Sequence, residues 1–167
     1  MSSLLHKTST PKNLKIAVLS ISTTRRLEND KSGLWIKKQA KKEGHEVVLH
    51  QVVTDDINAI TEALNHVIDR VVPNAVIMTG GTGISPKDVT IEAVRPMFNK
   101  ELTAFGPVFA QLSFDEIDSA AILSRATAGI INESVVFCMP GSLKACKLAC
   151  NELIFPELGH LLKHIKE

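Results

Sequence analysis

The chain has 167 residues, of which 44% are apolar, so it is long enough to fold as one domain around a sizeable core. Its 19 basic and 18 acidic residues leave a formal charge of +1, which argues against the basic surface that nucleic-acid binding needs. No apolar run has the length of a membrane span, and the polar first residues lack the apolar stretch of a secretory signal. We therefore expect a cytoplasmic protein without nucleic-acid or membrane partners.

The start of the chain and its cysteines add two expectations. Residues 1–13 are polar and predict a flexible N-terminal arm before a single domain at 14–167. Three cysteines without framework spacing favour reduced thiols. Cys146 and Cys150 lie four residues apart on a predicted helix, where a metal site can begin. Because no histidine or further cysteine is near them in the sequence, we interpret them as buried small residues.

Short runs rich in β-branched residues alternate with helical patterns along the chain. Strands are predicted at 14–22, 46–53, 75–79, 127–131 and 135–139, the last two joined by a turn. Helices are predicted from a cap at Asp30 or Ser32 to Gly44, at 57–71, after a cap at Thr90, in two pieces within 102–124, and after Pro140 and Gly141. Strands interleaved with helices predict an α/β fold of three layers, a mostly parallel sheet with helices on both faces.

Ligands of such sheets bind where the strands end. Four unusual segments occupy predicted strand ends: 20–24, the pair Asp55 and Asp56, the glycine loop TGGTGISPKDVT at 79–90, and MPGS at 139–142. Because the carboxyl ends of parallel strands share one edge of the sheet, these segments are expected to meet. Their convergence is the main sign of a site in the sequence.

The glycine loop does not match the common nucleotide motifs. A Walker loop needs serine or threonine after its lysine, whereas Lys87 is followed by Asp88. A dinucleotide fingerprint would follow the first strand, where ISTTRR has no glycine. The amides of Gly80, Gly81 and Gly83 can nevertheless converge on an anion, with Thr82 and Ser85 as further donors.

Asp88 stands at the end of this anion-binding loop, although a carboxylate repels phosphate. Mg²⁺ resolves the conflict because it bridges carboxylates and phosphate oxygens, and Asp55 would be a second carboxylate. The combination favours nucleotidyl or phosphoryl transfer. Helix-cap roles for Asp55, Asp56 and Ser142, and a turn role for Asp88, remain open alternatives.

Five segments in this order resemble the molybdopterin adenylyltransferase family of molybdenum-cofactor biosynthesis, in its MoaB-type branch (MoaB/Mog). They are TGGTGISPKDVTIEA, AFGPVF, LSFDEI, LSRATAG and MPGSLKA, and the resemblance covers about 14–161. It implies the molybdenum-cofactor biosynthesis protein fold, with molybdopterin and ATP as ligands. The implied activity is that of a nucleotidyltransferase, the Mg²⁺-dependent transfer of AMP from ATP to the terminal phosphate of molybdopterin with release of pyrophosphate. A homotrimer or homohexamer is also implied.

The resemblance also implies site residues. The catalytic and metal-binding aspartates fall on Asp88 and Asp55, with Asp56 competing for the second place because the aspartate is doubled. The positions that match substrate-binding parts are Ser20 and Ser22, Gly80, Gly81, Thr82, Gly83 and Ser85, Ser124, and Pro140, Gly141 and Ser142.

One residue departs from the family pattern. After Phe105 and Gly106 the family commonly has glutamate, whereas this chain has Pro107. Pro107 keeps open a second hypothesis, a non-catalytic molybdopterin-binding module that acts for a partner enzyme. A third hypothesis is a structural or stress-linked protein with a vestigial pocket.

Overall fold

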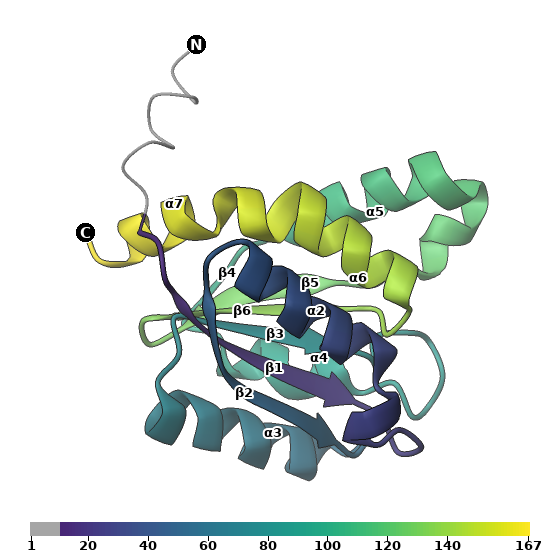
Figure 1. The fold of residues 1–167 in the computed structure, drawn as a ribbon. Helices are drawn as coiled ribbons and strands as arrows, with labels where there is room; N and C mark the ends of the chain where they lie inside the picture. Colours follow the sequence, from purple (N-terminus) through teal and green to yellow (C-terminus); the bar gives the residue numbers. More distant parts are fainter. Residues whose placement is uncertain (1–10) are drawn as a thin grey trace.

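The structure is a computed structural model that describes residues 11–167, so the first ten residues of the predicted arm lie outside the described part. Its centre is a six-stranded sheet in the order β2-β1-β3-β6-β5-β4 (Figure 1). β1, β2, β3 and β6 are parallel, whereas β5 is antiparallel to β6 and to β4. The strands are β1 (Lys15–Ile21), β2 (Glu46–Val53), β3 (Ala75–Thr79), β4 (Lys100–Glu101), β5 (Thr127–Ile131) and β6 (Ser134–Met139).

Helices connect the strands and follow the last one. The main helices are α2 (Lys31–Lys42), α3 (Ile57–His66), α4 (Thr90–Val94), α5 (Phe105–Ile117), α6 (Leu143–Ala149) and α7 (Phe155–Ile165). Short 3₁₀ segments are η2 (Leu27–Asn29), η4 (Arg95–Met97) and η5 (Asp118–Leu123), and π-helical segments are η3 (Val67–Val71) and η6 (Cys150–Ile154). In the part of the chain that the structure describes, no helix has the length and apolar character needed to cross a bilayer.

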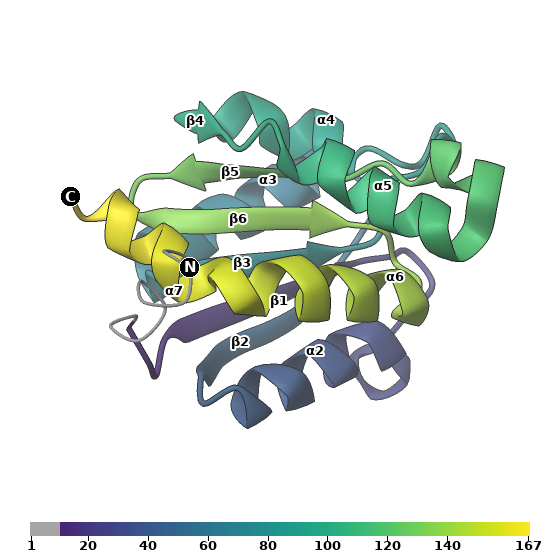
Figure 2. The ribbon, with the colours of Figure 1, turned by 90° about the horizontal axis from the view of Figure 1, so that it is seen from above.

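The sheet separates two apolar cores. Ile16 and Val18 of β1 point to the side covered by α2, α5, α6 and α7, and Ala17 and Leu19 point to the side of α3 and α4. Figure 1 shows α2, α6 and α7 on one face with α3 on the other, and Figure 2 shows α2, α6 and α7 lying over the strands. Successive strand residues point to opposite faces, so both faces of a central strand are apolar. The predicted three-layer α/β fold is confirmed.

Two local features differ from the sequence-based expectation. β4 was not predicted, because its two residues are charged and exposed and carry no apolar alternation. Thr90 is not a helix cap: its buried hydroxyl donates to the Gly80 carbonyl at 2.8 Å, and its amide donates to the Gly81 carbonyl at 2.9 Å. Thr90 therefore ties the end of the glycine loop back to its beginning.

The first turn of α2 contains a buried carboxylate. Asp30 is fully buried, and it caps the helix by accepting from the Gly33 amide at 3.1 Å. Its other oxygen lies 2.8 Å from Nε2 of His50 on β2. Burial by itself raises the pKa of the Asp30 carboxyl, but the hydrogen bonds with His50 and Gly33 outweigh it and hold that pKa below its ordinary value. The carboxylate is therefore ionised in the folded protein.

Asp30→Asn keeps the size of the side chain and removes its charge. We expect it to lower the free energy of unfolding by about 1–3 kcal/mol near pH 7, because a buried charged hydrogen bond and part of a helix cap are lost. A lowered folded pKa gives a stabilisation that is complete above the unfolded pKa and lost as pH falls through the folded value. In urea unfolding, the difference between wild type and Asp30→Asn should therefore shrink toward about pH 3.

The matched control is Asp115→Asn, an exposed aspartate on α5. It should leave the free energy of unfolding unchanged at both pH values. A deficit of Asp30→Asn that stays constant from neutral to acid pH would show that the Asp30 charge does not stabilise the fold.

Candidate functional site

The loops that follow β1, β2, β3 and β6 surround one cavity of about 380 Å³. The parallel strands end at the same edge of the sheet, so four segments far apart in the sequence come together there. The lining residues are Ile21, Ser22, Thr24, Arg25, Asp55, Gly80, Gly81, Thr82, Gly83, Asp88, Leu123, Pro140 and Gly141. The structure thus brings together all four strand ends that the sequence had marked.

Both predicted catalytic carboxylates lie against the glycine loop. A Cβ atom on Gly81 would stand 3.2 Å from Oδ1 of Asp55, and one on Gly83 would stand 2.6 Å from Oδ2 of Asp88. Gly80 and Gly81 have φ values of +100° and +66°, which side chains rarely adopt. The loop therefore needs glycine for its conformation and for the close approach of the two carboxylates.

Asp55 and Asp56 point in different directions. Asp55 is half-buried and lines the cavity, and its Oδ2 accepts hydrogen bonds from the amide and hydroxyl of Thr23 at 2.7 and 3.0 Å. Asp56 is exposed, and it caps α3 by accepting from the Ala59 amide at 2.9 Å. The helix-cap role thus belongs to Asp56, and Asp55 faces the cavity.

Asp88 closes a turn and lines the cavity at the same time. Its amide donates to the Ser85 carbonyl, and its Oδ2 accepts from the Ser85 amide, both at 2.9 Å. Ser85 is exposed and does not line the cavity, so it supports Asp88 through its backbone. Thr82 contributes to the lining, and its buried hydroxyl has no hydrogen-bond partner within 11–167.

These groups fit Mg²⁺ held together with phosphate. Mg²⁺ takes oxygen ligands and commonly binds one or two carboxylates plus substrate phosphates and water. Asp55 and Asp88 supply two half-buried carboxylates beside a loop of backbone amides. Residues 11–167 contain no cluster of three or more His, Cys, Asp or Glu side chains placed to hold a metal. Asp55 and Asp88 are fewer ligands than Mg²⁺ takes, so an ion held by them would need further oxygen ligands.

The cysteines are buried free thiols, and none of them lines the cavity of the two aspartates. Burial raises the pKa of Cys138 to about 12 and raises the pKa of Cys146 and Cys150. A protonated thiol is neither a nucleophile nor a metal ligand at neutral pH. The interpretation of Cys146 and Cys150 as buried small residues is confirmed.

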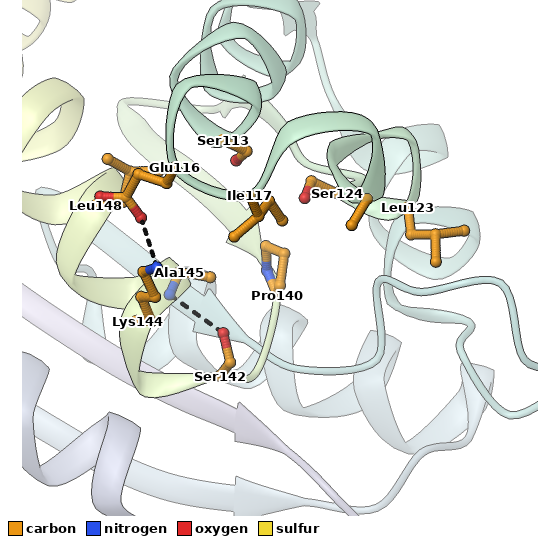
Figure 3. A pocket seen from close by; sticks show the side chains of 11 residues that line it. Ser113, Glu116, Ile117, Leu123, Ser124, Pro140, Ser142, Lys144, Ala145 and Leu148 are labelled. Carbon is orange, nitrogen blue, oxygen red and sulfur yellow. Dashed lines mark hydrogen bonds and ion pairs between the residues drawn. The ribbon is translucent and has the colours of Figure 1, made fainter.

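A second cavity, of about 210 Å³, adjoins the first and shares Leu123 and Pro140 with it. Figure 3 shows Ser124, Pro140 and Ser142 among the side chains that line it, with the Glu116–Lys144 ion pair on one side. Ser142 caps α6 by accepting from the Ala145 amide at 3.1 Å, and Nζ of Lys144 lies 3.7 Å from Glu116. The predicted residues Ser124, Pro140 and Ser142 therefore border this second cavity, and Pro140 borders the first cavity as well.

The two serines predicted from the first strand differ in position. Ser22 lines the first cavity, and its hydroxyl accepts from the amides of Thr24 and Arg25 at 3.3 and 3.1 Å. Ser20 is fully buried inside β1 and lines neither cavity. Its hydroxyl faces the first turn of α2 instead, so direct contact between Ser20 and a ligand is not supported.

One residue that lines the first cavity was not predicted from the sequence. This residue is Arg25, and its position in a polar loop after the first strand was the only available signal.

Pro107 lines a separate cavity of about 450 Å³ with Glu92, Arg95 and Arg125, and Ser124 borders this cavity too. The departure from the family pattern thus lies outside the cavity of the two aspartates.

Comparison with known proteins identifies relatives of this chain. Residues 17–160 match the family model described as a probable molybdopterin binding domain. The molybdenum cofactor biosynthesis protein B of Bacillus subtilis is 43% identical over 163 residues, which cover 97% of this chain and 96% of the relative. The protein of the same name from Bacillus anthracis is 44% identical and covers 96% of each chain.

Solved structures give the same result. A crystal structure of molybdenum cofactor biosynthesis protein B superposes with a TM-score of 0.91 at 42% identity, covering 95% of this chain and 99% of the other. The tungsten cofactor synthesizing protein MoaB from Pyrococcus furiosus gives a TM-score of 0.82 at 40% identity, over 94% and 99% of the two chains. Given the family model that covers residues 17–160, the near full-length sequence similarity and the matching fold, this chain belongs to the molybdopterin-binding domain family and is a homologue of molybdenum cofactor biosynthesis protein B.

Proposed function

We propose that this protein is a molybdopterin adenylyltransferase of molybdenum-cofactor biosynthesis. It would transfer AMP from ATP to the terminal phosphate of molybdopterin, with Mg²⁺, and release pyrophosphate. The observation that carries this proposal is the position of Asp55 and Asp88, which both border the glycine loop in one cavity. Two carboxylates beside converging amides suit a reaction in which phosphate charge has to be offset.

The chemistry needs no proton acceptor on the protein. An oxygen of the terminal phosphate, largely dianionic at neutral pH, attacks the α-phosphorus of ATP and forms a new P–O–P bond. The bond from the α-phosphorus to the oxygen of the β-phosphate breaks, and pyrophosphate leaves with the electron pair. The amides of Gly81 and Gly83 would donate to phosphate oxygens as charge develops, whereas the Gly80 amide is already bonded to the Met139 carbonyl. Asp55 and Asp88 would hold Mg²⁺, which neutralises phosphate charge when bound.

The adjoining cavity supports a place for the pterin. It has apolar walls of Ile117, Ala145 and Leu148 and the hydroxyls of Ser124 and Ser142 at its edge. Because Leu123 and Pro140 line both cavities, a ligand can place its phosphate in one and its ring in the other. We infer that Ser124, Pro140 and Ser142 contact molybdopterin on this side.

Asp88→Asn tests the proposal most directly. It keeps the turn with Ser85 but removes the charge that would hold Mg²⁺, so we expect the rate of AMP transfer to fall by about 100-fold or more. The measurement is pyrophosphate release and formation of adenylylated molybdopterin by purified protein with ATP and Mg²⁺. Asp115→Asn serves as the control with wild-type rates. Near-normal pyrophosphate release by Asp88→Asn would rule out the assigned role.

Asp55→Asn and Asp56→Asn form a matched pair, because the two residues are neighbours with different contacts. Asp55→Asn should lower the rate as severely as Asp88→Asn, since the carboxylate over Gly81 is lost. Asp56→Asn should leave the rate almost unchanged and cost at most about 1 kcal/mol of stability, because asparagine also caps helices. Steady-state rates and thermal unfolding of both variants check this, and the reverse order of effects would refute the choice of Asp55.

The second candidate function is a non-catalytic module that binds molybdopterin for a partner enzyme. Pro107 favours it, since the family commonly has glutamate at this position. However, Pro107 lies in the cavity of Glu92, Arg95 and Arg125 and leaves both aspartates in place. The assay of adenylylated product separates the two functions, because both include molybdopterin binding and only the first includes turnover. Failure to bind molybdopterin would favour a vestigial pocket.

We also propose that the protein is a homotrimer or homohexamer. Support comes from apolar side chains exposed on one helical region, α5 and η5. Val108, Phe114 and Ile122, which line neither cavity of the site, are 41%, 55% and 86% exposed. Light scattering should give a mass three or six times 18.2 kDa, and a mass near 18.2 kDa would contradict the proposal.

The cytoplasmic location stays a prediction. The free, buried thiols of Cys138, Cys146 and Cys150 are compatible with a reducing compartment.

A further inference from the structure

Arg25 is the only basic side chain among the described residues that line the cavity of the two aspartates. It lies in the loop after β1, and its side chain is 37% exposed. Its Nη1 donates to the Gly141 carbonyl at 3.3 Å and lies 4.0 Å from the buried carboxylate of Asp30. A cationic group is therefore fixed between the first and the last of the four loops.

Several contacts hold Arg25 in this place. Its amide donates to the Ser22 hydroxyl at 3.1 Å, which fixes the backbone of the loop. The carbonyl that its side chain meets is itself held, because Ser32 Oγ donates to the Gly141 oxygen at 2.8 Å. Asp30 is fixed by His50 and by the Gly33 amide. The guanidinium is thus oriented before any ligand binds.

The guanidinium keeps donors available for a ligand. Arginine has five N–H donors in a planar fork, and within 11–167 the hydrogen bonds of this side chain use Nη1 alone. The group also stands beside the start of the glycine loop. A Cβ atom on Gly141 would lie 3.1 Å from the Gly80 Cα and 3.7 Å from Arg25 Nη1. Arg25 and the glycine loop therefore border the same cavity.

The charge of the cavity shows why such a cation is needed. Asp55 and Asp88 carry two negative charges, and one divalent ion neutralises them without offsetting any charge on a phosphate ligand. A phosphate group that enters adds further negative charge. Arg25 is the side chain of the cavity that can meet this charge, and its fork suits two phosphate oxygens.

We propose that Arg25 is a substrate-binding residue whose guanidinium contacts a phosphate group in the cavity of Asp55 and Asp88. This proposal rests on the proposed function only in naming the two phosphate-bearing ligands, ATP and molybdopterin. A purely structural Arg25 would only clamp the loop after β6 through Gly141. The two roles differ in their effect on ligand affinity, which allows a test.

The test compares Arg25→Gln, Arg25→Lys and the neighbouring control Arg26→Gln. Arg26 is exposed and does not line the cavity. For Arg25→Gln we expect the KM for ATP or for molybdopterin to rise roughly 10- to 100-fold, because a charged hydrogen bond is lost. Arg25→Lys should recover part of this loss, since it keeps the charge without the fork. Arg26→Gln should match wild type.

Calorimetric binding of Mg²⁺–pyrophosphate separates this proposal from the proposed function. Weaker binding by Arg25→Gln than by wild type, with a smaller salt dependence, supports the role of Arg25 even if wild type transfers no AMP. If wild type is active and Arg25→Gln has the same KM values and the same pyrophosphate affinity as wild type, the proposed role of Arg25 is overturned. Wild type that binds neither pyrophosphate nor ATP overturns both proposals. If Arg25→Gln unfolds at a lower temperature than wild type, the pyrophosphate affinity of Arg25→Lys is compared with that of wild type instead. Weaker binding by Arg25→Lys supports the role of Arg25, and unchanged binding overturns it.

Discussion

The parallel register of β1, β3 and β6 is the constraint on which the site depends. Ser20 pairs with Thr79, and Thr79 pairs with Met139, so the three strands end at the same level. Hydrogen bonds then join the loops: the Gly80 amide donates to the Met139 carbonyl at 3.0 Å, and the Thr79 hydroxyl donates to the Pro140 carbonyl at 3.0 Å. Apolar packing on both faces keeps the strands in this register, so the core determines where the polar loops meet.

The sequence was informative where local pattern decides structure. β2 and β3 have the predicted bounds, because each is a short apolar run between polar turns. The glycine loop, Asp55 and Asp88 were found because their residue types are unusual at strand ends. Asp55 and Asp56 were indistinguishable in the sequence, since both suit a cap. Only the geometry of the α3 start separates them, and it gives the cap to Asp56.

What the sequence missed depends on contacts between distant residues. Arg25 meets Gly141, which is 116 positions away, and nothing near Arg25 in the chain indicates this contact. Ser20 matched the family's loop, but it is the one buried polar residue of β1 and faces Asp30 and His50. His50 belongs to no motif recognised in the sequence, yet its side chain is hydrogen-bonded to the Asp30 carboxylate beside Arg25. Such roles follow from the packing of α2 on the sheet, which no local pattern contains.

Gly83 has a consequence for how the loop tolerates variation. Unlike Gly80 and Gly81, it does not have a positive φ, so its backbone is open to any residue. The constraint is space, because the Asp88 carboxylate occupies the position that a Cβ would need. Even alanine, the smallest side chain, would have to displace that carboxylate. Asp88, five residues later, therefore determines which residues position 83 can accept. Glycine is required at position 83 only as long as the Asp88 carboxylate keeps its place.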